Sequence, residues 1–268
     1  MFTFGAGVQW FEAYNAAKQR NRVLVGGFSP RGSVGAAGGW LQGGGHSVLS
    51  PSYGLGAQSL PLGTAACSRD CFAGVDNVLE ITIVTANGHH VIANAYNNRA
   101  LFWALRGGGG GSWGVVTSVS YKTHPSTPFV GVSLNVNSAN PNSTRKLLTE
   151  IVRLTPSLVD QGYGGSVNGT VDGFQFFILS PNVTVEQANA TLITLSKFAN
   201  SQPGLSVQSV IIPFPDFSSF YEPTFANTDG LVGVPNEISS WLLPKDVIHH
   251  RPEHVVIELL KLPVFSYL

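Results

Sequence analysis

Hydrophobic residues recur at regular spacing in the first half of this 268-residue chain. Trp10, Tyr14 and Ala17 share one face of a helix within residues 8–20, which follows an opening strand. A short strand is expected at 23–27. Four further elements are expected: a strand over 79–83, a strand over 91–93, a short helix or turn over 97–105 and a strand over 115–121.

The pair Asn87-Gly88 separates two of these strands and predicts a hairpin. A two-residue type I′ turn needs positive φ at both central residues, which asparagine and glycine tolerate best. We therefore expect Asn87 and Gly88 to be the two central residues of such a turn.

After residue 125 the chain has fewer glycines and its elements are longer. Alternation predicts strands, and spacing of three and four residues predicts helices. The expected order is a strand over 130–136, a helix around 147–154, a hairpin of strands 164–171 and 174–179 across Asp172-Gly173, a helix around 188–198 and a strand over 205–212. This β-α-β-β-α-β order predicts an antiparallel sheet with helices on one face, so the fold class is α+β. We place the domain boundary near 125–128, which gives domains 1–126 and 127–268.

Two glycine clusters dominate the first domain. The first runs from Gly35 to Gly45 and ends on His46-Ser47, and the second is a five-glycine run after Arg106. Glycine loses more backbone entropy on folding than any other residue, so such clusters need a reason, commonly the close approach of a phosphate or a flat cofactor. Neither cluster fits G-x-x-x-x-G-K-[ST] or a strand-to-helix G-x-G-x-x-G, so a P-loop is excluded and a dinucleotide Rossmann turn is disfavoured.

The composition and charge of the chain limit the kinds of molecule or ion that it is expected to bind. Basic and acidic residues balance at 15 each, which gives no electrostatic reason to expect nucleic acid or an anionic membrane. No apolar stretch approaches the ~20 residues of a membrane span. His249, His250, Glu253 and His254 have metal-ligand spacing, but Pro252 would break the helix that such a site requires, so no metal is expected.

Glycosylation sequons and cysteines carry information about the cellular compartment of the protein. Four Asn-x-Thr/Ser sequons begin at Asn142, Asn168, Asn182 and Asn189 and favour an extracellular or secretory parent protein, although chance accounts for them equally well. The N-terminus shows no signal peptide. Cys67 and Cys71 could form a local disulfide or remain two inert thiols, and two ligands alone do not support a metal site.

Several motifs in order resemble one known family. They are Val34-Gly-x-x-Gly-Gly through Gly43-Gly-Gly-His-Ser, Tyr53-Gly-Leu, Asp76-Asn-Val-Leu, Val84-Thr-Ala-Asn-Gly, and Leu101-Phe-Trp-Ala-Leu-Arg-Gly through Val116-Thr. Together they resemble the FAD-linked oxidases of the vanillyl-alcohol oxidase superfamily, in particular the fungal berberine-bridge-enzyme-like branch. The resemblance is motif by motif from residue 1 to about His124 and looser beyond.

The resemblance implies an FAD-binding domain, here partial, and a substrate domain that begins near residue 128. It implies FAD as cofactor and, as partners, a small organic substrate and dioxygen. The loops at 43–47 would hold the pyrophosphate and ribityl chain, and the segment 107–116 would lie against the adenosine. The cofactor-binding residues that it implies are Gly38, Gly39, Gly43, Gly44, Gly45, His46, Ser47, Ser50, Tyr53, Gly54, Asp76, Gly109, Gly110, Gly111, Ser112, Gly114, Val115 and Val116.

Three departures from the family pattern shape the functional expectation. The Arg-x-Gly-Gly-His motif, whose histidine binds flavin covalently, has no counterpart, and no cysteine precedes Val34. Residues 58–75 interrupt the family's usual run as an atypical insertion. The family's C-terminal tail, which often supplies the catalytic base, is also absent, so no catalytic residue is named. The expectation is an FAD-dependent oxidase; the alternative is a truncated, catalytically silent relative, and a glycoprotein without cofactor leaves the glycine clusters unexplained.

Overall fold

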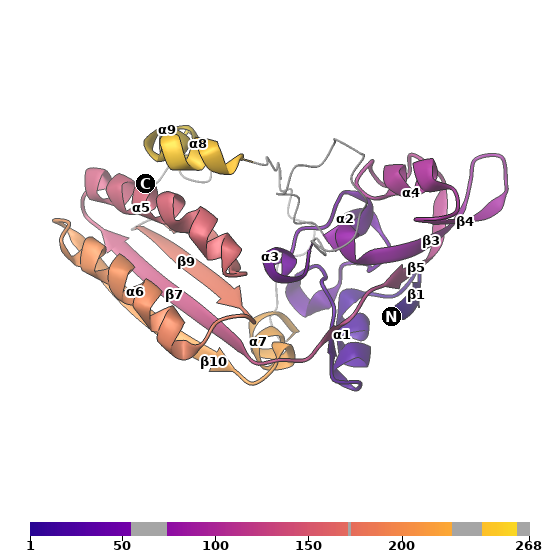
Figure 1. Ribbon diagram of the computed structural model, residues 1–268, viewed down its shortest axis with the longest axis horizontal. Helices are drawn as coiled ribbons and strands as arrows, with labels where there is room; N and C mark the ends of the chain where they lie inside the picture. The colour runs from indigo at the N-terminus through magenta and orange to yellow at the C-terminus, as the bar shows by residue number, and fades with distance from the viewer. Residues whose placement is uncertain (55–73, 171–172, 227–242, 262–268) are drawn as a thin grey trace. The chain divides into compact units, whose positions relative to one another are not determined.

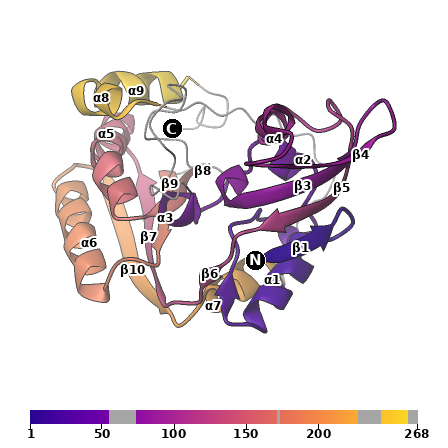
Figure 2. The same ribbon diagram turned by 45° about the vertical axis from the view of Figure 1, so that its right-hand side comes forward.

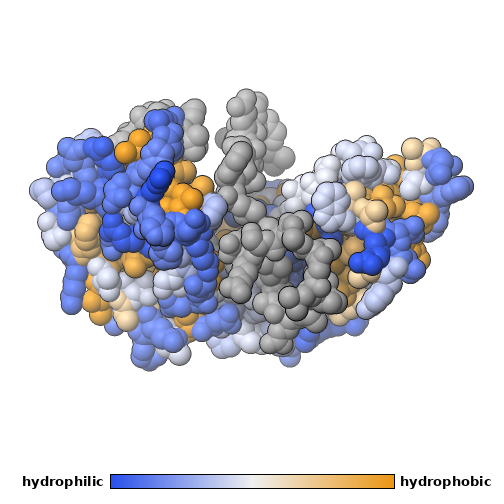
Figure 3. All heavy atoms as spheres, turned by 45° about the horizontal axis from the view of Figure 1, so that its top comes forward, coloured by the Kyte–Doolittle hydropathy of each residue, from blue (hydrophilic) through white to orange (hydrophobic). Residues whose placement is uncertain are grey.

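The computed structural model describes residues 1–54, 74–170, 173–226 and 243–261. The chain divides into two compact units: one comprises Met1–Thr127 and Pro215–Ile238, the other Pro128–Phe214 and Ser239–Leu268. In Figure 3, hydrophobic side chains form small patches among hydrophilic ones on both units. No helix in the described ranges is long and apolar enough to cross a membrane.

The first unit is built on a four-stranded antiparallel sheet (Figure 1). Its strands, in spatial order, are β1 (Phe2–Gly5), β5 (Val115–Tyr121), β3 (Val78–Val84) and β4 (His90–Asn94). A second, two-stranded sheet pairs β2 (Arg22–Val23) with β6 (His124–Pro125). The strand expected at 23–27 is therefore shorter and begins one residue earlier, because its partner β6 is itself two residues long.

Short helices join these strands. They are α1 (Trp10–Lys18), α2 (Gly39–Gln42), α3 (Ser50–Tyr53), α4 (Arg99–Leu105) and α7 (Phe217–Tyr221), with 3-10 turns at Pro30–Gly32 and Gly74–Asn77 and a π-turn at Glu222–Ala226. Figures 1 and 2 show α4 over β3 and β4, which it contacts. Helix α1 begins with a capping box, in which the Gln9 amide donates to Glu12 at 2.9 Å.

Trp10 is the centre of the first unit's core. Its side chain is fully buried, and its ring lies 5.3 Å from Tyr14, 5.0 Å from Trp40 and 5.5 Å from Tyr121, centroid to centroid. Edge-to-face and tilted aromatic pairs of this kind add about 0.5–1.5 kcal/mol each beyond the area they bury. The core therefore ties helix α1 to strand β5 and to the segment that contains Trp40.

The turn between β3 and β4 differs from the type I′ expectation. Gly88 has φ +80°, but Asn87 is not among the residues with positive φ. The Gly88 amide donates to Thr85 at 2.9 Å, and the Thr85 amide donates to His89 at 3.0 Å, so the loop is three residues long. Three-residue hairpin loops favour a type I turn followed by a left-handed residue, which requires only one glycine. The hairpin was predicted correctly, and its turn type was wrong.

The second unit carries an antiparallel sheet in the order β10-β7-β9-β8. Its elements are β7 (Phe129–Ser138), α5 (Pro141–Asp160), β8 (Gly164–Thr170), β9 (Gly173–Ser180), α6 (Val185–Asn200), β10 (Leu205–Phe214), α8 (Lys245–His250) and α9 (Pro252–Leu259). Helices α5 and α6 contact each other and β7, so they cover one face of the sheet. The expected β-α-β-β-α-β order and the α+β class are confirmed.

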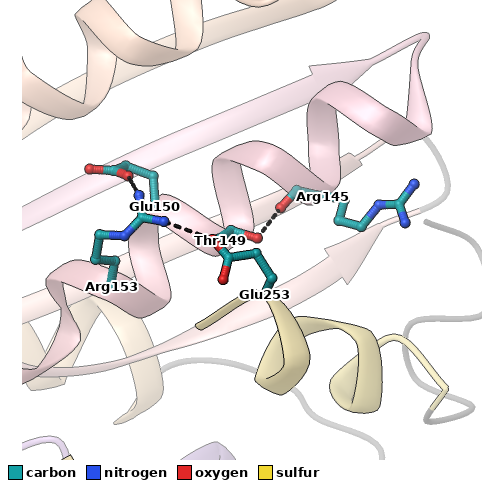
Figure 4. Close-up of polar contacts among 5 residues, drawn as sticks. All are labelled: Arg145, Thr149, Glu150, Arg153 and Glu253. Atoms are coloured by element: carbon teal, nitrogen blue, oxygen red, sulfur yellow. Dashed lines mark hydrogen bonds and ion pairs between the residues drawn. The ribbon is translucent and has the colours of Figure 1, made fainter. Parts of the chain in front are cut away.

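One hydrophobic core holds this unit together. Leu134 of β7 and Leu147 of α5 are fully buried in it, as is Leu195 of α6. Val256 of α9 joins the same core at 1% exposure. At the surface, Arg153 of α5 contacts Glu150 at 2.5 Å and Glu253 of α9 at 2.9 Å (Figure 4).

Candidate functional site

The first glycine segment, residues 35–47, folds back on itself around Trp40. Gly38 caps helix α2 and Gly39 begins it. The chain then turns through Gly44 at φ +108° and Gly45 at φ +73°. The indole Nε1 of Trp40 donates to the backbone oxygen of His46 at 3.1 Å, which closes the loop.

The second glycine segment, residues 107–114, lies directly against the first. The Gly109 amide donates to the backbone oxygen of Gln42 at 2.9 Å. The buried side chain of Gln42 in turn donates to the Ala37 oxygen at 3.1 Å. A Cβ at Gly110 would stand 3.7 Å from the Cα of Gly39. Two clusters far apart in sequence therefore lie against each other.

Some of these glycines are required by packing within the protein. A Cβ at Gly45 would stand 2.8 Å from the Trp40 ring, and Gly45 also has positive φ. A Cβ at Gly114, where φ is +141°, would collide with the carbonyl oxygen of Val84. At these positions the fold alone explains the residue.

Other glycines have no such reason. Among the described residues, Gly39 has no atom within 4 Å of its Cβ position, and the nearest such atom at Gly38 is 3.8 Å away. At Gly110 the nearest atom is 3.7 Å away. None of the three has positive φ. Their missing side chains leave open space beside the backbone, which is the arrangement that a closely bound ligand needs.

The 3-10 turn Gly74–Asn77 interacts with both glycine segments. Its backbone bonds to the first segment, and the charge of Asp76 acts on Arg106, which precedes the second. The Val75 amide donates to the Gly44 oxygen at 3.1 Å. Burial lowers the pKa of Arg106 below its ordinary value. The negative charge of Asp76 acts in the opposite direction and is the smaller effect. The Arg106 guanidinium carbon lies 4.5 Å from the centre of the Phe102 ring, and Nε is buried with no hydrogen-bond partner in the described part of the chain.

The remaining predicted residues near the first segment have different environments. His46 is exposed, whereas Ser47 is buried and its Oγ accepts from the Leu49 amide at 3.3 Å. Ser50 begins helix α3, and its Oγ is buried without a partner among the described residues. The Gly54 amide donates to the Ser50 oxygen at 2.7 Å and ends the helix.

Four predicted residues lie toward the sheet end of the second segment. Gly111, at φ +77°, and Ser112 are exposed. Val115 and Val116 belong to β5, where they pair with Val84 and Ile83, and Val116 is buried in the core. The candidate site thus consists mainly of residues 38–54, 75–77 and 106–110.

The sequence reasoning missed His124 and Asn77 as candidates. His124 Nε2 lies 2.7 Å from Asn77 Oδ1, and the Tyr53 ring stacks on the imidazole with centroids 4.2 Å apart. Asn77 directly follows the predicted Asp76, which was a usable signal; His124 lies 47 residues farther along and carried none. Gln42 and Arg106 flank predicted glycines and were likewise not chosen.

Metal and disulfide expectations concern other parts of the chain. Helices α8 and α9 are separated at Arg251, with φ −139° and ψ 46°, so the helix is interrupted before Pro252 as predicted. In the described ranges no group of three or more His, Cys, Asp or Glu residues could hold a metal ion. Cys67 and Cys71, with nearly all of the insertion 58–75, lie outside the described residues.

Known proteins are similar to this chain in sequence and in fold. No protein-family model matches the chain. It is 32% identical over 267 residues to an uncharacterised FAD-linked oxidoreductase of Arthroderma benhamiae, covering 97% of this chain and 43% of the relative. It is 38% identical over 193 residues to the FAD-linked oxidoreductase ZEB1 of Gibberella zeae, covering 72% and 30%. Among solved structures, the VAO-type flavoprotein MtVAO615 of Myceliophthora thermophila matches with a TM-score of 0.76 and 25% identity, over 97% of this chain and 44% of that one.

The chain belongs to the FAD-linked oxidoreductases of the vanillyl-alcohol oxidase type. FAD is the cofactor of this family, as the names of its members state. The resemblance seen in the motifs is confirmed. The chain spans less than half the length of these FAD-linked relatives.

Proposed function

We propose that the two glycine segments bind FAD and that the chain serves an FAD-dependent oxidase acting on a small organic substrate. The observation that carries this proposal is the open space at Gly38, Gly39 and Gly110, where neither packing against the described residues nor backbone conformation calls for glycine. A cofactor that approaches the backbone closely explains why no side chain is present there.

The charges of the site fit a cofactor with a pyrophosphate. Arg106 precedes the second glycine segment, and its buried Nε–H is unpaired among the described residues. A guanidinium offers several donors to phosphate oxygens, and an anionic partner would compensate its partial burial. Backbone amides of the glycine segments other than those of Gly43, Gly44, Gly108 and Gly109, which bond within the protein, would supply further donors.

The chemistry is divided between cofactor and protein. When bound, FAD supplies a flavin that takes up a hydride and delivers the electrons to dioxygen. In the proposal, residues of the first unit bind and orient the cofactor: Gly38, Gly39, Gly43–Gly45, His46 and Ser47 from the first segment, Asp76 from the turn, and Gly109–Gly111 from the second. The second unit, Pro128–Phe214 and Ser239–Leu268, is proposed to hold the substrate.

An absorption spectrum tests the proposal. The purified chain is titrated with FAD and separated from free flavin, and acid precipitation then shows where the colour goes. We expect FAD to bind and to appear in the acid supernatant, since no residue for a covalent link is proposed. A chain that binds no FAD refutes the proposal. A chain that binds FAD yet reduces it with none of a panel of alcohols, amines and oligosaccharides supports the catalytically silent relative.

We also propose that the parent protein enters the secretory pathway. The asparagines of all four sequons, Asn142, Asn168, Asn182 and Asn189, are exposed in the second unit. Exposure is what a folded glycoprotein requires at its glycan sites. Expression through a eukaryotic secretory pathway, followed by glycosidase treatment and intact mass, would show the glycans; an unmodified mass would contradict the proposal.

A further inference from the structure

Asn77 is an asparagine buried beside the first glycine segment, with 1% of its surface exposed. Its short turn is fixed at both ends. The Val75 amide donates to the Gly44 oxygen at 3.1 Å, and the Asn77 backbone oxygen accepts from the Lys122 amide at 2.7 Å. The side chain of Asn77 is therefore held at a defined place next to the segment that turns through Gly44.

His124 holds the side chain of Asn77 in one orientation. The distance from His124 Nε2 to Asn77 Oδ1 is 2.7 Å. Burial, assisted by the positive charges of Lys122 and Arg22, lowers the pKa of His124 to about 4, so the ring is neutral near pH 7. In the neutral tautomer that carries its proton on Nε2, the ring donates and Oδ1 accepts. Stacking on Tyr53 at 4.2 Å and 22° fixes the plane of the imidazole.

The nitrogen at the other end of the same amide has no partner within the described part of the chain. Asn77 Nδ2 is buried, and no acceptor lies within hydrogen-bond distance among the described residues. A buried donor left unpaired costs about 1–3 kcal/mol, and native proteins rarely keep one without a reason. The hydroxyl of Ser50, one helical turn before Tyr53 in α3, is buried and unpaired in the same way.

We infer that Asn77 Nδ2 donates a hydrogen bond to an oxygen acceptor of the bound FAD, and that His124 is a positioning residue that aims this donor. The inference rests on the proposed function. It assigns a cofactor-binding role to Asn77, which no glycine motif includes. It also explains why a histidine and an asparagine are buried together beside the glycine segments.

The test compares FAD affinity in two matched variants. Asn77→Asp keeps the shape of the side chain and the oxygen that accepts from His124, and it replaces the Nδ2 donor with an oxygen. Asn15→Asp makes the same change at an exposed position of α1 in the same unit. From flavin fluorescence titrations at pH 8, we expect at least tenfold weaker binding for Asn77→Asp and less than a twofold change for Asn15→Asp.

His124 is tested by the contrast between two substitutions. His124→Leu removes the donor that holds Asn77, so FAD binding is expected to weaken three- to tenfold. His124→Gln retains a side-chain N–H and is expected to recover part of this loss. Equal affinity of both variants and the wild type would contradict the positioning role.

A measurement on the unmodified chain covers the case in which Asn77→Asp does not fold. The side-chain amide resonances of ¹⁵N-asparagine-labelled protein are assigned and compared with and without FAD. We expect the Asn77 NH₂ signals to shift. If the wild type binds FAD but these signals stay in place, or if Asn77→Asp folds and binds equally well, the inference fails while the proposed function stands. If the wild type binds no FAD, both fail.

Discussion

The phenolic hydroxyl of Tyr121 donates a hydrogen bond to the backbone oxygen of Ala36. Tyr121 ends strand β5 and is fully buried, and Ala36, the second residue of the first glycine segment, is fully buried as well. Burial raises the pKa of Tyr121 well above its ordinary value, so the hydroxyl keeps its proton. This bond fixes the start of the candidate site to the sheet.

Tyr121→Phe should destabilise the first unit. The change leaves the Ala36 oxygen buried without this donor, which costs about 1–3 kcal/mol. Urea unfolding of the two proteins measures the difference. Tyr96→Phe is the matched control, because Tyr96 is 90% exposed. A loss below about 0.5 kcal/mol for Tyr121→Phe would show that the Ala36 oxygen finds another donor.

Glycines of the candidate site should divide into two classes on substitution. Gly39→Leu should abolish FAD binding with little loss of stability, because no atom of the described part of the chain lies within 4 Å of its Cβ position. Gly114→Ala should destabilise the fold, because its Cβ would collide with Val84 and its φ is +141°. FAD titration and thermal unfolding separate the two effects.

Gly7→Leu is the control for the first class. Gly7 is exposed, and no described residue comes within 4 Å of its Cβ position either, but it lies outside both glycine segments. Its substitution should leave FAD binding unchanged. Equal loss of binding from Gly7→Leu and Gly39→Leu would mean that the open space at Gly39 is unrelated to the cofactor.

Acid should weaken the fold through His124. The folded pKa of about 4 lies below the ordinary value of 6.5, so between these values the unfolded chain binds a proton that the folded chain does not. The free energy of unfolding therefore falls as pH decreases from about 7 to 4, by at most about 3 kcal/mol from this residue.

Urea unfolding at pH 7.5 and pH 5 measures this dependence. His124→Gln should reduce the difference between the two pH values, whereas His89→Gln, at an exposed residue of the β3–β4 loop, should not. A slope with pH that is identical in all three proteins would show that His124 is protonated with no more difficulty in the folded chain than in the unfolded one.

Apolar contacts should contribute more to the stability of helix α9 than the ion pairs of Figure 4 do. Arg153 and Glu253 are 48% and 64% exposed at their side chains, and exposed pairs contribute only about 0–1 kcal/mol. Val256 is 1% exposed in the core, so Val256→Ala should cost about 2 kcal/mol. Urea unfolding of Arg153→Met and Val256→Ala compares the two contributions. A larger loss of unfolding free energy in Arg153→Met than in Val256→Ala would contradict the prediction.

Local patterns in the sequence were sufficient for most elements of the fold. Strand β5 (Val115–Tyr121) has the predicted bounds, since alternation depends only on neighbouring residues. The turn at Asn87-Gly88 could not be typed, because its conformation depends on whether Thr85 pairs with His89 across the strands. Strand β2 was too long in the prediction because its partner strand ends after two residues.

The candidate site, too, could be predicted only in part from local patterns in the sequence. Its glycine segments are visible because each is contiguous in sequence, and the contact of Gly109 with Gln42 agrees with one shared ligand. The side chains that complete it are not visible in this way. Whether His124 meets Asn77 is decided by the pairing of β6 with β2 and by the stacking of Tyr53, which no local pattern encodes.

The composition of the first unit from two stretches of chain has a consequence for its synthesis. Tyr14 packs against Tyr221 at 4.6 Å and Phe28 against Phe225 at 4.9 Å, and Lys18 pairs with Glu222 across 204 residues. A ribosome that adds about 5–20 residues per second needs on the order of ten seconds or more to deliver these partners. During that time the strands of the second unit are synthesised, while the rings of Tyr14 and Phe28 lack these contacts. We expect the nascent first unit to be prone to aggregation in this interval, and chaperone binding to the ribosome-bound chain to be strongest before residue 217 is synthesised.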